Sequence, residues 1–151
     1  MISGCTRYRY SLWREWNAHA PQMIIIGLNP STADASADDR TIRRCIGFAK
    51  REACGRLVML NLFAFRATKP RDMLAAVDPV GPRSDSVLRS YARDPRTAFT
   101  VAAWGTQASP ERVAVVMTMF SSLLCFGTNA DRSPRHPLYQ RADTPLVPYR
   151  W

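Results

Sequence analysis

The feature that most constrains the fold is an alternation of short apolar runs with segments of helical periodicity. Residues 23–28 are a continuous run of β-branched and other apolar side chains, apart from one glycine, which predicts a strand buried on both faces. Residues 39–54 repeat their apolar side chains at helical spacing. We expect Asp38 or Asp39 to cap this helix and Gly55 to end it.

The same alternation continues to the end of the chain. Further strands are expected at residues 57–63, 99–104 and 123–126, and helices at 70–76, 84–93 and 110–120, with Ser109 as an N-cap before Pro110. This order predicts a single domain over residues 1–151, a three-layer α/β/α sandwich with a central, mostly parallel sheet of four to five strands. Residues 7–13 are expected to form a strand or an edge hairpin.

Net charge narrows the classes of partner. The chain has 151 residues and carries 21 Lys+Arg against 12 Asp+Glu, a formal charge of +9. All of the basic residues except Lys50 and Lys69 are Arg. An Arg-rich surface favours nucleic acid, although a GC-rich genome explains the Arg excess equally well. Genome composition explains the choice of Arg over Lys but not the excess of basic over acidic residues. That excess indicates an acidic partner.

Other classes of protein are not supported by the sequence. The four cysteines form no Cys-x-x-Cys pair and have no close histidine, so we expect reduced thiols and no metal site. No apolar run is long enough to span a membrane, and the chain does not open with a secretory leader. We expect a cytoplasmic protein without a cofactor. Its oligomeric state is left open, with a monomer assumed.

Candidate functional residues follow the predicted strands. In parallel sheets, ligands bind where loops leave the carboxyl ends of strands. Here those loops are residues 29–39, 64–70, 105–108 and 127–139, which hold most of the candidate polar side chains. We therefore expect one crevice at that edge of the sheet.

Six motifs in and around these loops resemble those of a bacterial and phage family known only as domain-of-unknown-function family 1643. The matching segments are residues 27–34, 38–44, 61–68, 78–81, 103–105 and 134–139. They cover nearly the whole chain, but the family name carries no chemistry.

Four landmarks also resemble, more distantly and in the same order, those of the uracil-DNA glycosylase superfamily. They are Gly27-Leu-Asn-Pro30 after the first strand, Asn61 in the second, Trp104-Gly105 after the third, and the loop beginning His136-Pro137. The resemblance implies a glycosylase-like fold and a DNA-binding protein, with DNA favoured over RNA, that excises an unusual or modified base. The last loop lacks the usual Ser after His-Pro, which leaves the substrate base open.

The resemblance and the chemistry of the residue types together assign three roles. Cleavage of an N-glycosidic bond needs a donor to the departing base anion and a positioned water. The catalytic candidates are therefore Asn29, Asp34 and His136, with Asn29 orienting the water. Those for binding a flipped base are Ser31, Asn61, Phe63 and Phe65. Those for nucleic acid are Arg43, Arg44, Arg66, Arg132 and Arg135, with Leu138 and Tyr139 as an apolar wedge.

Structural roles compete with each assignment. Asn29 is suited to shaping a turn, Asn61 to a buried polar pair, and Asp38 and Asp39 to capping. Trp104 is expected in the core, and the basic helix is either a solvated face or a backbone track.

Two other functions stay open. One is an enzyme acting on free nucleosides or nucleotides through the same pocket. The other is a non-catalytic module that binds nucleic acid or protein. Independently of that choice, Ser31 paired with His136 as a nucleophile is a minor alternative.

Overall fold

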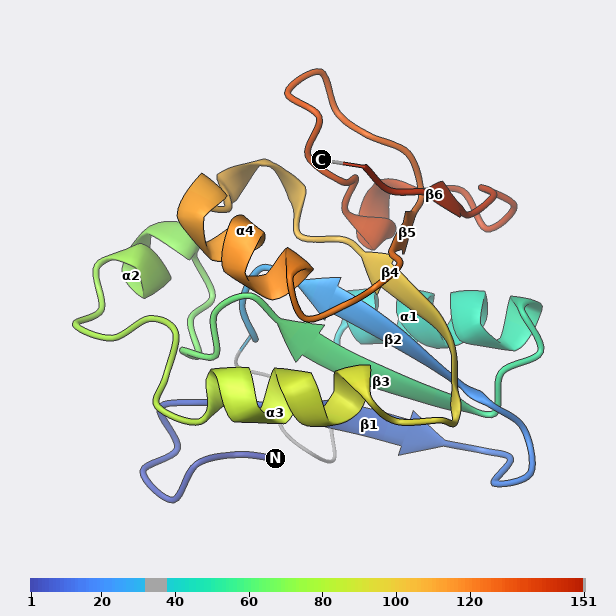
Figure 1. The fold of residues 1–151 in the computed structure, drawn as a ribbon, viewed down its shortest axis with the longest axis horizontal. Coiled ribbons are helices and arrows are strands. Elements are labelled where there is room, and N and C mark those ends of the chain that lie inside the picture. The colour runs from blue at the N-terminus through green and yellow to red at the C-terminus, as the bar shows by residue number, and fades with distance from the viewer. Residues whose placement is uncertain (32–37, 151) are drawn as a thin grey trace.

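The protein, here a computed structural model that describes residues 1–31 and 38–150, folds into an α/β structure around one six-stranded sheet (Figure 1). Its strands lie in the order β1-β3-β2-β4-β5-β6. Their bounds are Leu12–Glu15 (β1), Gln22–Gly27 (β2), Arg56–Asn61 (β3), Thr97–Ala102 (β4), Leu124–Cys125 (β5) and Val147–Pro148 (β6). The α-helices are Arg40–Arg51 (α1), Pro70–Leu74 (α2), Ser84–Ala92 (α3) and Pro110–Met117 (α4), and the 3₁₀ turns are Gly105–Gln107 (η1) and Pro137–Tyr139 (η2).

The sheet is mixed, which corrects the expected mostly parallel sheet of four to five strands. The four strands predicted from the apolar runs are all present and pair in parallel. Antiparallel strands extend both edges, with β1 against β3 and β6 against β5. Both residues of β6 are exposed, so this strand leaves no apolar run in the sequence. In β1 only Leu12 is buried, so apolar alternation there is weak.

Helices cover both faces of the sheet (Figure 1). On one face α1 packs Ile42, Cys45 and Phe48 against β2 and β3. On the other face α2, α3 and α4 bury Met73, Leu88 and Val116 against the same strands. Side chains alternate between the two faces along β2, so that Ile24 and Ile26 pack into one core and Met23 and Ile25 into the other. This explains why the sequence of β2 is apolar throughout.

The caps explain where the helices begin. The Asp39 carboxylate accepts the Ile42 backbone N–H at 2.8 Å, and the Ser109 hydroxyl accepts that of Arg112 at 3.4 Å. Each of these side chains satisfies an otherwise unpaired N–H of the first turn. Of the two expected caps for α1, Asp39 is therefore the one used, while Asp38 forms a salt bridge with Arg14 at 2.8 Å.

The end of α1 differs from the expectation. The helix stops at Arg51, and Ala53 adopts a left-handed backbone conformation with φ 59°. Gly55 does not terminate the helix. Instead its backbone lies so close to Asn17 that an added Cβ would stand 2.1 Å from the Asn17 carbonyl oxygen, a tertiary contact with no local sequence signal.

Three thiols, those of Cys45, Cys54 and Cys125, are buried, and Cys5 is exposed; all four are free. Burial raises the pKa of each of the three buried thiols. Within residues 1–31 and 38–150, no helix combines the length and apolar character needed to cross a membrane.

Candidate functional site

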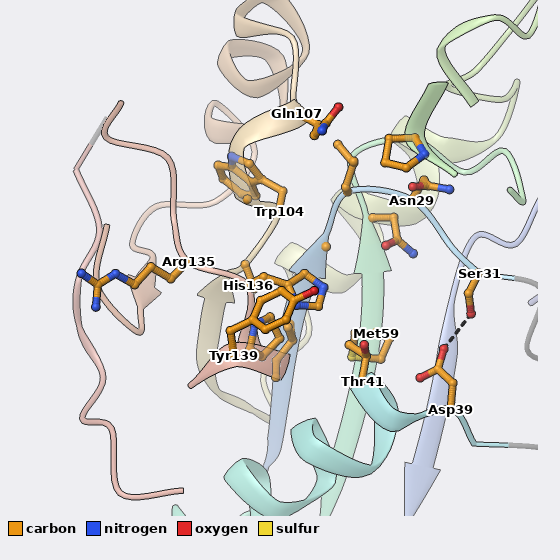
Figure 2. Close-up of a pocket in the computed structure, with 18 of the residues that line it drawn as sticks. Asn29, Ser31, Asp39, Thr41, Met59, Trp104, Gln107, Arg135, His136 and Tyr139 are labelled. Carbon is orange, nitrogen blue, oxygen red and sulfur yellow. Dashed lines mark hydrogen bonds between the residues drawn. The ribbon is translucent and has the colours of Figure 1, made fainter. Parts of the chain in front are cut away.

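A pocket of about 760 Å³ opens beside the carboxyl ends of β2, β3 and β4 (Figure 2). Strand β2 has β3 on one side and β4 on the other, so the connections leaving these strands diverge and leave a crevice. All four loops expected there contribute to the lining. Asn29, Asn61 and His136, which are far apart in sequence, line this same pocket.

Asn61 is the last residue of β3 and lies opposite Gly27 in the parallel register. Its side chain is buried, with the residue 8% exposed, yet the carboxamide has no hydrogen bond to any residue in the described ranges. A Cβ on Gly27 would stand 2.9 Å from the Asn61 Oδ1 atom, so glycine at position 27 provides room for the amide. Neither atom of the amide is among the buried polar atoms that lack a partner, so the amide is accessible from the pocket that it lines. The donor and acceptor of Asn61 are therefore available to a ligand in the pocket.

His136 caps the short η2 turn with its ring. Its Nδ1 atom accepts the Leu138 backbone N–H at 3.2 Å. Burial lowers the pKa of His136, partly opposed by the negative charge of Asp39. In the neutral imidazole the proton must then sit on Nε2, because Nδ1 is the acceptor. His136 is thus held as a neutral hydrogen-bond donor.

The side chain of Asn29 connects two loops at the pocket. Its Nδ2 atom donates to the carbonyl oxygens of Pro30 and Ala67, at 3.1 and 2.9 Å, and so joins the loops after β2 and β3. With both N–H groups of the amide used, its Oδ1 atom is the part left to act as an acceptor. The residue shapes the loop and also lines the pocket.

A second polar group of the pocket surrounds Asp39. The hydroxyl of Ser31 donates to Asp39 Oδ2 at 2.7 Å, while the other carboxylate oxygen caps α1. The hydroxyl proton is thereby committed to Asp39, which disfavours the Ser31–His136 nucleophilic pair. Arg9 also lines the pocket and is only 5% exposed. Burial, with Arg66 nearby, lowers the pKa of Arg9 to about 10, and Asp39 opposes this shift.

Two aromatic candidates lie outside the pocket. Phe63 is packed in the core beneath α2 and α4, and Phe65 sits edge-on to Tyr8 with ring centroids 6.0 Å apart. Beyond Asn61 the chain continues beside the end of β2, with the Leu62 and Phe63 N–H groups donating to the Gly27 and Leu28 carbonyls, and the Phe63 ring packs into the core. Neither ring lines the pocket, so the structure does not bring these two candidates together with Asn29, Asn61 and His136. Trp104 is 3% exposed and belongs to the core, as expected.

The nucleic-acid candidates are divided between three places. Arg135 and Tyr139 line the pocket, with Tyr139 81% exposed at its mouth and its ring 5.6 Å from that of His136 (Figure 2). Arg43, Arg44 and Leu138 line a separate, open groove beside it. Arg66 and Arg132 line neither cavity; Arg66 donates to the Thr6 carbonyl at 3.2 Å. Asp34 lies outside the described residues.

Sequence reasoning missed Arg9, Thr41 and Gln107 as pocket residues. Gln107 lies in one of the four strand-exit loops and could have been found as a polar residue there. Arg9 precedes the first regular element, and no periodicity or spacing connects it with the loops.

A family model described as "Protein of unknown function (DUF1643)" matches residues 9–138. No curated protein and no solved structure was found to match the chain. The match covers most of the chain and includes Asn29, Asn61 and His136, the three pocket residues singled out above. The chain therefore belongs to the DUF1643 family.

Proposed function

We propose that this protein binds a nucleobase in the pocket at the strand ends and hydrolyses its N-glycosidic bond, acting on an unusual or modified base of DNA. The observation that carries the proposal is the carboxamide of Asn61, a largely buried residue that lines the pocket. It has no hydrogen-bond partner in the described part of the chain and it lines the same cavity as His136 and Asn29.

Recognition would rest on Asn61. A carboxamide offers a donor and an acceptor side by side, which matches the edge of a pyrimidine. Within a duplex that edge is already paired, so the base must leave the stack to reach a buried amide. The cavity of about 760 Å³ lies within the size range of small-molecule sites. The exposed ring of Tyr139 at its mouth offers a surface for stacking.

The chemistry would use His136 and Asn29. Water attacks the sugar C1′ atom as the bond from C1′ to the base nitrogen breaks, and the bonding electrons leave with the base. The neutral Nε2–H of His136 donates to the base oxygen on which this negative charge collects. Asn29 Oδ1 accepts a hydrogen bond from the attacking water, whose proton passes to solvent. An amide is a poor base, so the proposal expects slow turnover.

The fold supports the same proposal. The central strands β3-β2-β4-β5 are parallel and carry helices on both faces, in keeping with a glycosylase-like sandwich extended by two edge strands. The motifs expected from that resemblance all lie at strand ends around one pocket.

The test is a cleavage screen. Single- and double-stranded oligonucleotides carrying uracil, mismatched bases or hypermodified pyrimidines are incubated with excess protein and then treated with alkali, which breaks the strand at abasic sites. We expect breaks on at least one substrate. Absence of breaks on every substrate refutes the activity.

Two variants assign the activity to the pocket. His136→Asn keeps an oxygen that can accept the Leu138 N–H but removes Nε2–H, and we expect it to lower the rate about 100-fold. Asn61→Asp keeps the shape but replaces the amide donor, and we expect it to abolish selective binding. Ser90→Ala, on the exposed surface of α3, is the control and should act as wild type. Equal activity of all three would place the reaction elsewhere.

Two additional assays, cleavage of free nucleosides and binding of the same substrates, separate the two other functions. Cleavage of free nucleosides with no cleavage of oligonucleotides identifies a nucleoside enzyme. Binding of a base that depends on Asn61, without product, identifies a binding module.

A further inference from the structure

A second cavity adjoins the pocket and has a different character. It is an open groove of about 510 Å³ lined by Arg40, Arg43 and Arg44 of α1 and by Leu138 of η2. The groove and the pocket share η2 as a wall, since the neighbours of Leu138 on either side, Pro137 and Tyr139, line the pocket. A ligand leaving the pocket over η2 would enter this groove.

The three arginines share one face of α1 through their spacing of three and four residues. In the part of the chain that is described, no carboxylate forms a salt bridge with any of them. Arg43 donates to the Asp38 carbonyl at 2.8 Å, and Arg44 donates to the Gln140 carbonyl. Both use neutral acceptors, so these three positive charges form no ion pair with a carboxylate of residues 1–31 or 38–150.

Arg44 adds a second observation. Its guanidinium lies over the Phe48 ring, 5.6 Å from the centroid, and its Nε atom is buried without a hydrogen-bond partner among the described residues. The bond to Gln140 and the contact with the Phe48 ring hold the Arg44 guanidinium in a fixed position at the wall of the groove.

We propose that this groove binds the phosphates of a nucleic-acid strand whose base occupies the pocket, so that the substrate is a polynucleotide. The inference rests on the proposed function. Guanidinium groups bind phosphate oxygens through paired N–H donors. A free nucleoside would fill the pocket alone and leave the groove empty, whereas a strand places phosphates on both sides of the flipped nucleotide.

The experiment compares two double variants that each remove two positive charges. Arg40→Gln with Arg43→Gln alters exposed groove residues and spares Arg44, which supports η2. Arg89→Gln with Arg93→Gln, exposed residues in and just after α3 on the other face of the sheet (Figure 1), is the matched control. Thermal melts verify that both fold. The probes are a labelled single-stranded deoxyoligonucleotide, 2′-deoxyuridine and its 5′-monophosphate, each titrated over a range of salt.

The slope of log K against log salt reports how many phosphates of a single strand the protein neutralises, at about 0.7 for each phosphate. We expect the groove variant, with two arginines fewer, to lower that slope for the oligonucleotide by about 1.4, and the ratio of oligonucleotide to nucleoside affinity at least tenfold. The control should leave both near the wild-type values. Equal reductions in the two variants, or none in the groove variant, overturn the proposal. So does an oligonucleotide that binds no tighter than the monophosphate.

Failure of the proposed function looks different. In that case Asn61→Asp changes neither nucleoside nor oligonucleotide binding, while the salt slope still reports whether the groove binds phosphates. The two results are therefore read separately.

Discussion

Replacing Gly27 by Ala tests whether the position of the Asn61 amide matters for function. The new Cβ would lie 2.9 Å from Asn61 Oδ1, about half an ångström inside ordinary van der Waals contact. The contacting atom is at the end of a side chain, so the amide shifts and the backbone does not. The backbone of Gly27 has no positive φ, and alanine fits a strand. We therefore expect the free energy of unfolding to stay within about 1 kcal/mol of wild type.

The effect on binding should be larger than the effect on folding. A hydrogen bond misplaced by this distance lowers affinity for the base about tenfold, which is about 1.4 kcal/mol. Gly47→Ala is the matched control, because an added Cβ there meets nothing within 4 Å. Lying inside α1, it should stabilise the fold by about 0.5–1 kcal/mol and leave binding unchanged.

Three measurements check this reasoning: urea denaturation, affinity for the oligonucleotide identified by the cleavage screen, and the NMR resonances of the Asn61 carboxamide. The NMR measurement needs no ligand. The resonances of the Asn61 carboxamide are identified as those that disappear in Asn61→Asp. We expect these resonances to shift in Gly27→Ala and to stay in place in Gly47→Ala. Unchanged resonances together with wild-type binding would refute the role assigned to Gly27.

Three further predictions concern stability. Because burial lowers the pKa of His136 below its usual 6.5, the unfolded chain binds its proton first as pH falls; urea denaturation should show stability lost below about pH 6.5 in wild type, and a smaller loss in His136→Gln. Arg9→Met should raise the free energy of unfolding by up to about 3 kcal/mol, since burial and the positive charge of the nearby Arg66 lower the pKa of Arg9 to about 10; a decrease would show that its contacts outweigh its desolvation. Arg112→Ala should lower stability by about 3 kcal/mol by thermal or urea melts, because its guanidinium donates to the Leu62 carbonyl at 2.6 Å and to Asp85 at 2.7 Å; a loss under 1 kcal/mol would contradict this.

Local patterns predicted the elements of the fold that bury most side chains. The run at residues 23–28 became β2, and the helix expected from residue 39 is α1 with Asp39 as its cap. Such patterns report burial and capping within a few residues, which is why they succeed. They failed for β6, whose two residues are both exposed, and at Gly55, whose close contact is with Asn17.

The candidate site was predictable in part for the same reason. Asn29 directly follows a predicted strand, Asn61 lies near the end of the next, and His136 belongs to the loop after the last. Parallel strands present their carboxyl ends, and the loops that leave them, at one edge of the sheet. The sequence does not distinguish Phe63 from these pocket residues, because the path of the backbone after the strand decides whether the ring faces the pocket or the core. Arg9 could not be found, because no local rule places its guanidinium beside Asp39.

The sequence by itself determined the central parallel strands, the helix that follows β2 and the polar character of the loops at the strand ends. These depend on side-chain periodicity and capping, which neighbouring residues express. Only the tertiary structure decided which segments form the antiparallel edge strands. It alone places the Asn61 carboxamide next to Gly27, without a hydrogen-bond partner among the described residues. It also placed the arginines of α1 in a groove beside η2. These features arise where segments far apart in the chain pack together, and such contacts leave no periodic trace in the sequence.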